Sequence, residues 1–213
     1  ETLNEMVAES SAKHAHADLW TEILDGIDLD ARSFLPHSAL NITELDDTQY
    51  ISVVNDLRTW GSVYGHFKVL PEKGIRQSGK VEFNSTFGKF AYNLRNARQI
   101  KIEPAGKDRS KMEITLDGGD AAIILFSDRE IGKFKAAMER DGDYICVTGQ
   151  ALDKDNNELA ISMPCVITVD GSPDYSGSTL FRNGRFMYRF PFEGTIPKVT
   201  IRELATGATI TLN

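Results

Sequence analysis

Apolar and polar residues alternate along much of the chain after residue 62. Alternation with a period of two places successive side chains on opposite faces of a strand, so it predicts strands buried on one face. In one such stretch Phe186, Tyr188 and Phe190 share a face that is expected to belong to the core, whereas Met187 and Arg189 are expected to face outward. The strands predicted in this way are 63–69, 77–83, 89–94, 99–104, 112–116, 121–126, 143–151, 165–169, 178–181, 185–190, 198–203 and 209–212.

Turn-forming residues separate these predicted strands. Between 112–116 and 121–126 stands the sequence Asp-Gly-Gly-Asp, and glycine supplies the positive φ angles that a tight turn needs. The two strands are therefore expected to pair as a hairpin. Strand 121–126 is apolar on both faces, which predicts a central position in its sheet.

Three stretches have helical spacing instead. Residues 3–25 carry apolar side chains at partly helical spacing, without an internal glycine or proline. Residues 46–61 carry five apolar side chains at helical spacing, with an aspartate as the expected cap and Gly61 as the stop.

The third predicted helix is 127–141. Ser127 and Glu130 fit a capping box, in which each side chain bonds a main-chain N–H at the start of the helix. Gly142 is the expected stop. This helix is taken as the end of an α+β domain over 1–142, followed by a β-sandwich over 143–213. The fold class predicted for the whole chain is mainly β.

The last third of the chain resembles the carboxypeptidase regulatory-like, or transthyretin-like, domains. The resemblance rests on VTGQALD at 147–153, VITVDG at 166–171 and GSTLFRNGRFMYRFP at 177–191. It implies a small Ig-like sandwich that serves as an accessory, assembly or adhesion module, and it implies no catalytic residues. One departure is the first turn, where the family has Gly-Lys and this chain has Asn156-Asn157-Glu158; asparagine tolerates the left-handed geometry required there.

Composition narrows the classes of function. The 213 residues are 41% hydrophobic and 26% charged, which is ordinary for a globular protein, and their net charge is −7. Non-specific nucleic-acid binding depends on Lys and Arg that neutralise phosphates, so an acidic chain is a poor candidate. No apolar run is long enough to cross a bilayer, and no signal peptide is predicted. Localisation in a virion or outside the cytoplasm is favoured, without a decisive motif.

No pattern typical of catalysis or of a bound cofactor is present, so neither is expected. His14 and His16 point apart on a helix and do not predict a metal site. The sequence Asp153-x-Asp155-x-Asn157 resembles the start of a calcium loop, but it lacks the glycine and the final glutamate of that loop. It is interpreted as a hairpin turn. Cys146 and Cys165 are either buried thiols or one disulfide.

The predicted function is that of a non-catalytic structural protein. It is expected to act by protein–protein contact in a larger assembly such as a virion or a cell-surface complex, and a homo-oligomer is one form that such an assembly could take. One alternative is a carbohydrate-binding module that uses exposed aromatic side chains. Another is an OB-type protein that binds single-stranded nucleic acid between arginines and stacking aromatics. The candidate interaction residues are Trp20, Trp60, Tyr64, Arg182 and Arg185.

Overall fold

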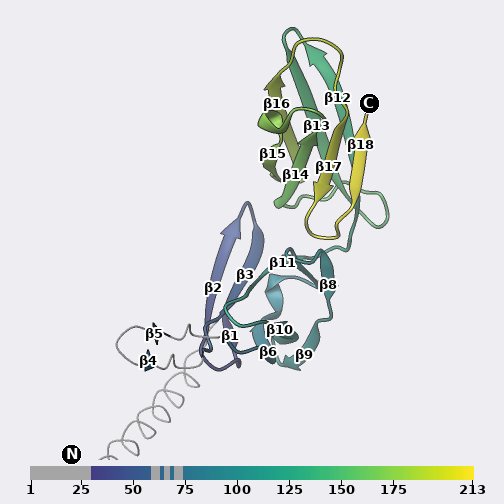
Figure 1. The fold of residues 1–213 in the computed structure, drawn as a ribbon. Helices are drawn as coiled ribbons and strands as arrows, with labels where there is room; N and C mark the ends of the chain where they lie inside the picture. The colour runs from purple at the N-terminus through teal and green to yellow at the C-terminus, as the bar shows by residue number, and fades with distance from the viewer. Residues whose placement is uncertain (1–29, 59–62, 65–67, 70–73) are drawn as a thin grey trace, which may run out of the picture. The chain divides into compact units, whose positions relative to one another are not determined.

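The computed structural model describes residues 30–58, 63–64, 68–69 and 74–213 (Figure 1). Residues Ala31–Asn213 form one compact unit. Every ladder between its strands is antiparallel, and the helices in the described residues are the short 3-10 turns η1 (Ser85–Phe87) and η2 (Pro173–Tyr175). The mainly β fold class is therefore confirmed.

The first half of this unit contains two larger sheets that share one buried core. Phe83 and Met112 come from one sheet, Val53 and Ile124 come from the other, and all four are fully or almost fully buried. The four-stranded sheet has the order β1 (Ala31–Ser33), β6 (Gln77–Asn84), β10 (Arg109–Leu116), β9 (Glu103–Gly106). The five-stranded sheet has the order β2 (Ser38–Leu45), β3 (Thr48–Asn55), β11 (Ala121–Ser127), β7 (Phe90–Asn93), β8 (Arg98–Ile100). A separate two-stranded pair consists of β4 (Val63–Tyr64) and β5 (Lys68–Val69).

The second half contains a three-stranded and a four-stranded sheet. Their shared core includes Phe181 and Phe186, which are buried because the alternating strand pattern turns every second side chain inward. The three-stranded sheet has the order β12 (Ile131–Asp141), β13 (Tyr144–Asp153), β16 (Arg185–Pro191). The four-stranded sheet has the order β15 (Gly177–Phe181), β14 (Met163–Val169), β17 (Val199–Glu203), β18 (Thr209–Leu212).

The predicted capped helix over 127–141 is wrong, because most of it is the strand β12. β12 pairs with β13 along its whole length, and Gly142, with a φ of 61°, lies in the turn between them. Instead of capping a helix, the Ser127 hydroxyl donates a hydrogen bond to the Arg129 carbonyl at 2.7 Å. The proposed division at residue 142 stays a prediction, although the hairpin spans that residue.

The predicted helix over 46–61 is also wrong where the structure describes it. Thr48–Asn55 is β3, paired with β2, and the two aspartates expected to cap a helix form the hairpin turn. Asp46 and Asp47 have φ angles of 47° and 63°, and a turn with two positive φ angles matches the twist of a hairpin. The helix expected over 3–25 lies outside the described residues. The α+β assignment of the first domain is not supported.

The predicted strands 112–116 and 121–126 are confirmed, but they do not pair with each other. β10 pairs with β6 and β9, whereas β11 pairs with β3 and β7 in the other sheet. The connection between them therefore crosses from one sheet to the other. The Asn55 side-chain amide holds it, donating to the carbonyl oxygens of Leu116 at 3.2 Å and Asp117 at 2.9 Å.

Candidate interaction surface

The outer face of the β12–β13–β16 sheet is the candidate interaction surface, and we call it the outer face below. Strand register aligns side chains in rows across the sheet, and the middle row is small or apolar. That row is Ala137, Thr148 and Met187, and the neighbouring row is Lys135, Gln150 and Arg185. Together with Gly149 and Phe186, these rows line a shallow hollow of about 600 Å³.

Met187 is the most prominent apolar side chain on this face. It is 68% exposed, whereas its neighbours Phe186 and Phe190 are buried. The prediction that the β16 aromatics face the core and Met187 faces outward is confirmed for these three residues. Gly149 makes room for the Phe186 ring, because a Cβ at Gly149 would lie 2.0 Å from its Cε1 atom. The ring can therefore lie directly against the β13 backbone beneath the outer face.

Arg185, one of the residues predicted to take part in an interaction, lies at the edge of the hollow and is held in place. Its Nε atom donates to Gln150 Oε1 at 2.6 Å, and its Nη2 atom lies 3.0 Å from Glu158 Oε2. The side chain is still 69% exposed. Two partners thus fix the direction of the guanidinium group without removing it from solvent, which reduces the entropy lost when it binds.

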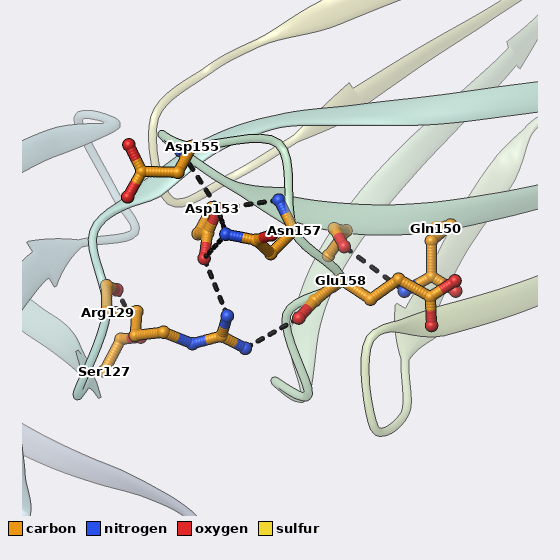
Figure 2. Close-up of polar contacts among 8 residues, drawn as sticks. Ser127, Arg129, Gln150, Asp153, Asp155, Asn157 and Glu158 are labelled. Carbon is orange, nitrogen blue, oxygen red and sulfur yellow. Dashed lines mark hydrogen bonds and ion pairs between the residues drawn. The ribbon is translucent and has the colours of Figure 1, made fainter.

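Glu158 is positioned in turn by the loop after β13 (Figure 2). The Asp153 carboxylate accepts hydrogen bonds from the main-chain N–H groups of Asn157 at 2.8 Å and Asp155 at 3.0 Å. Arg129 bridges this turn, donating to Asp153 Oδ2 and to the Glu158 carbonyl oxygen at 2.6 Å each. These hydrogen bonds fix the conformation of the loop from Asp153 to Glu158, and the loop thereby positions the Glu158 carboxylate beside Arg185.

The sequence that resembles the start of a calcium loop forms this turn, in agreement with its interpretation as a hairpin turn. Asn156 has a φ of 65°, the left-handed conformation that asparagine tolerates. Asp153 is 5% exposed, and its oxygens are occupied by the turn and by Arg129. Among the residues that the structure describes, no three His, Cys, Asp or Glu side chains form a group able to hold a metal ion.

The bonds to Asp153 predict an acid-sensitive contribution to stability. Burial raises the pKa of Asp153, but hydrogen bonds from Asn157, the charge of Arg129 and the bond from Asp155 outweigh it and hold the pKa below its usual value. A lowered folded pKa means that the stabilisation is complete above the unfolded pKa of about 3.9 and is lost as the pH falls through the folded pKa. The melting temperature of wild type is expected to fall more steeply below about pH 4 than that of Asp153→Asn.

Thermal melts between about pH 2 and 7 check this expectation. Asp155→Asn is the matched control, because Asp155 contributes its main-chain N–H to the turn and its side chain is exposed. Asp155→Asn should retain the steep acid dependence of wild type. Parallel melting curves for wild type and Asp153→Asn would contradict the assignment.

Arg182, the other arginine predicted to interact, is also exposed and is paired with a carboxylate. It lies 3.2 Å from Asp46 in the turn between β2 and β3, and Asp46 also accepts a hydrogen bond from the Ser162 hydroxyl at 2.9 Å. Tyr50 donates to the Ser162 carbonyl oxygen. Burial, followed by the charge of Asp46, raises the pKa of Tyr50 to about 12, so its hydroxyl stays protonated as a donor.

For the other three predicted interaction residues, the structure describes no contact with the outer face. Trp20 and Trp60 lie outside the described residues, and the backbone of Tyr64 belongs to β4 while its side chain is not described. Cys146 and Cys165 are free and buried. Burial, with a smaller effect from the charge of Glu203, raises the pKa of the Cys165 thiol to about 12, which keeps it unreactive.

The sequence interpretation missed Lys135, Thr148 and Gln150 as parts of the surface. Lys135 was assigned to a helix, so its alignment with β13 and β16 was not foreseen. The alternation of outward polar residues in 143–151 was the available signal, but which strands flank it depends on long-range pairing.

Comparison with known proteins gives no match to any protein-family model or to any curated protein. The resemblance to carboxypeptidase regulatory-like domains therefore stays a prediction. Within the described residues, no helix has the length and apolar character required to span a membrane.

Proposed function

We propose that this chain is a non-catalytic assembly protein and that the outer face is the surface by which it contacts a protein partner. The observation that carries this proposal is Met187, which is 68% exposed although it lies within the strand β16 and not at a loop tip. Methionine and arginine are enriched at protein interfaces, where a small apolar centre is surrounded by a polar rim. The row of Ala137, Thr148 and Met187 supplies the small and apolar centre, and Arg185 belongs to the rim.

The proposal includes a sandwich arrangement of the transthyretin-like kind for the second half of the chain. It is supported by seven strands in sheets of three and four that share one buried core. Such a scaffold would present the outer face rigidly, with little order to be gained on binding. The partner in this proposal is another component of a larger assembly, such as a virion or a cell-surface complex.

The groups with strongly raised pKa values support a structural role for the chain. Burial raises the pKa of Tyr92, like that of Tyr50, to about 12, and the Tyr92 hydroxyl accepts a hydrogen bond from the Ile131 N–H at 2.9 Å. Cys165 lies in the core of the second half. These shifts arise where side chains are packed and bonded to the main chain, whereas a catalytic group would face a cleft.

We favour contact with a protein partner over nucleic-acid binding because the candidate arginines are already paired and the aromatic rings are buried. Arg182 and Arg185 are both paired with carboxylates, of Asp46 and Glu158. Phe186 and Phe190 are buried and cannot stack on bases.

A photo-cross-linking amino acid placed at residue 187 tests the proposal in the cells that produce the protein. The matched control position is Ile196, which is 45% exposed and lies outside the outer face. We expect a discrete cross-linked partner from residue 187 and none of the same mass from residue 196. Met187→Glu should reduce recovery of that partner by about 30-fold, the loss typical of removing an interface hot spot, whereas Ile196→Glu should not. Equal labelling from both positions would contradict the proposal.

A further inference from the structure

The strand β12 stands at the edge of the three-stranded sheet and is unusually long. It has 11 residues, pairs with β13 on one side, and has no ladder on its other side among the described strands. Part of β18 lies close to it, but the two strands are in different sheets. A long unpaired edge is a template for another strand unless the protein blocks it.

The main-chain groups available at this edge follow from the hairpin register. Asp141 and Tyr144 face each other across the two-residue turn, so they form the hydrogen-bonded pair that closes it. Antiparallel bonding alternates along the ladder, so Ala137 also bonds towards β13. The N–H and C=O groups of Ala136 and Met138 therefore point to the open side.

The side chains of β12 carry a charge pattern that is complementary to itself. On the outer face of this strand the order is two basic residues, one small residue and two acidic residues, all of them exposed. These residues are Lys133, Lys135, Ala137, Glu139 and Asp141. Within the described residues, neither lysine is in an ion pair, and Glu139 is not in one either. Asp141 is paired with Arg189 at 3.0 Å.

We propose that a second copy of this chain pairs antiparallel with β12 about a two-fold axis at Ala137. In that register Lys135 of each copy lies opposite Glu139 of the other, and Lys133 lies opposite Asp141. Ala136 and Met138 then form the hydrogen-bonded pairs, in agreement with the direction of their main-chain groups. Directly opposed side chains lie close enough to interact, and opposite charges there are favourable.

Neighbouring registers and the other edge of the sheet fit less well. With the two-fold axis at Ala136 or Met138, only one lysine of β12 lies opposite a carboxylate of β12 in the other copy, instead of the two lysine–carboxylate pairings formed with the axis at Ala137. On the β16 edge, an axis at Met187 would place Arg185 opposite Arg189, and like charges directly opposed are destabilising. The charge pattern therefore selects a second copy as the occupant of the β12 edge and selects one register.

The inference rests on the proposed function only in treating this sheet as a contact surface. A strand added at the edge extends the sheet sideways, so Met187 and the outer face stay accessible to another partner. The two proposals can therefore fail separately.

Disulfide trapping tests the register. Ala137→Cys places two thiols at the two-fold axis, where opposed Cα atoms in a non-hydrogen-bonded pair lie about 4.5 Å apart, within disulfide range. We expect full-length Ala137→Cys to form a covalent dimer under mild oxidation at low micromolar concentration. Lys133→Cys is the control, because residue 133 would lie opposite Asp141 of the other copy and should form no covalent dimer. Equal trapping of both variants, or of neither, would overturn the proposed register.

Charge reversal tests the partner. Lys135→Glu and Glu139→Lys each place like charges opposite one another in their own homodimer, so each should raise the dissociation constant by at least about ten-fold in sedimentation experiments. Mixing the two variants restores both opposite-charge pairs, and a heterodimer should form. Lys198→Glu changes an exposed lysine outside β12, and this variant should dimerise like wild type.

Wild-type protein that stays monomeric at about 100 µM would overturn this inference. So would a dimer that none of these charge changes affects. If a monomeric protein still yields the partner cross-link from residue 187, only the second-copy inference fails, and the proposed function stands.

Discussion

Replacing Gly184 with alanine is expected to lower the free energy of unfolding by about 2–5 kcal/mol. Gly184 has a φ of 80°, a conformation that costs an alanine roughly 1–2 kcal/mol. A Cβ there would also lie 2.0 Å from the carbonyl oxygen of Leu159, and forced overpacking costs typically 1–3 kcal/mol. The clash is with main chain, so rotating a side chain cannot relieve it.

The backbone around Gly184 explains why this close approach exists. The Gly184 N–H donates to the Ile161 carbonyl at 2.7 Å, and its carbonyl accepts from the Ala151 N–H at 2.7 Å. These two hydrogen bonds join the turn between β15 and β16 to β13, through Ala151, and to the segment that follows the loop after β13, through Ile161. Moving Gly184 away from Leu159 would weaken these buried bonds.

Urea denaturation followed by fluorescence measures the effect. Gly171→Ala is the matched control, because Gly171 has a φ of 71° with nothing within 4 Å of the added Cβ. It should lose only the conformational part, about 1–2 kcal/mol. If the two variants were equally destabilised, the contact with Leu159 would not be present in the protein.

The second half of the fold was largely predictable because its strands are short, alternating and separated by turn residues. Asn183-Gly184 is a two-residue hairpin turn that sequence alone identifies, and both residues have positive φ. Burial of Phe186 and exposure of Met187 followed from the same alternation. In these segments local preference and long-range pairing agree, so the sequence was sufficient.

β12 shows why other segments were not predictable. Ile131, Phe134 and Met138 have helical spacing, but Phe134 and Met138 are also compatible with one face of a strand. Pairing with β13 decides between the two, and that pairing is a tertiary interaction that a local pattern does not contain. The error hid Lys135 and the charge pattern of the β12 edge, because both depend on the strand.

The candidate surface was only partly predictable for a related reason. Arg185 was identified, but its partner Glu158 lies 27 residues away in the chain, and Arg182 and its partner Asp46 are separated by 136 residues. Many acidic residues could serve as partners for an arginine on an acidic chain. Only the folded backbone selects among them: it pairs Arg182 with Asp46 and Arg185 with Glu158, and both arginine side chains stay exposed.

Phe181→Ala is expected to be among the most destabilising single substitutions in the second half of the chain, with a loss of about 3–5 kcal/mol. Phe181 is fully buried, and its ring makes edge contacts with Phe134 at 5.8 Å and Phe186 at 4.8 Å between ring centroids. Removing the ring leaves a cavity between the two sheets. Because β12, β15 and β16 hold these three rings, such a cavity cannot collapse without moving strands of both sheets.

Chemical denaturation of the purified variant measures this loss, and Met187→Ala on the neighbouring strand is the control. Met187 is 68% exposed, so its truncation should change stability by no more than about 0.5 kcal/mol. The two variants should also distinguish a loss of stability from a loss of partner binding. Met187→Ala should weaken partner capture while the free energy of unfolding stays nearly unchanged. A comparable destabilisation by both would mean that Met187 is packed inside the protein, and the outer face would lose its apolar centre.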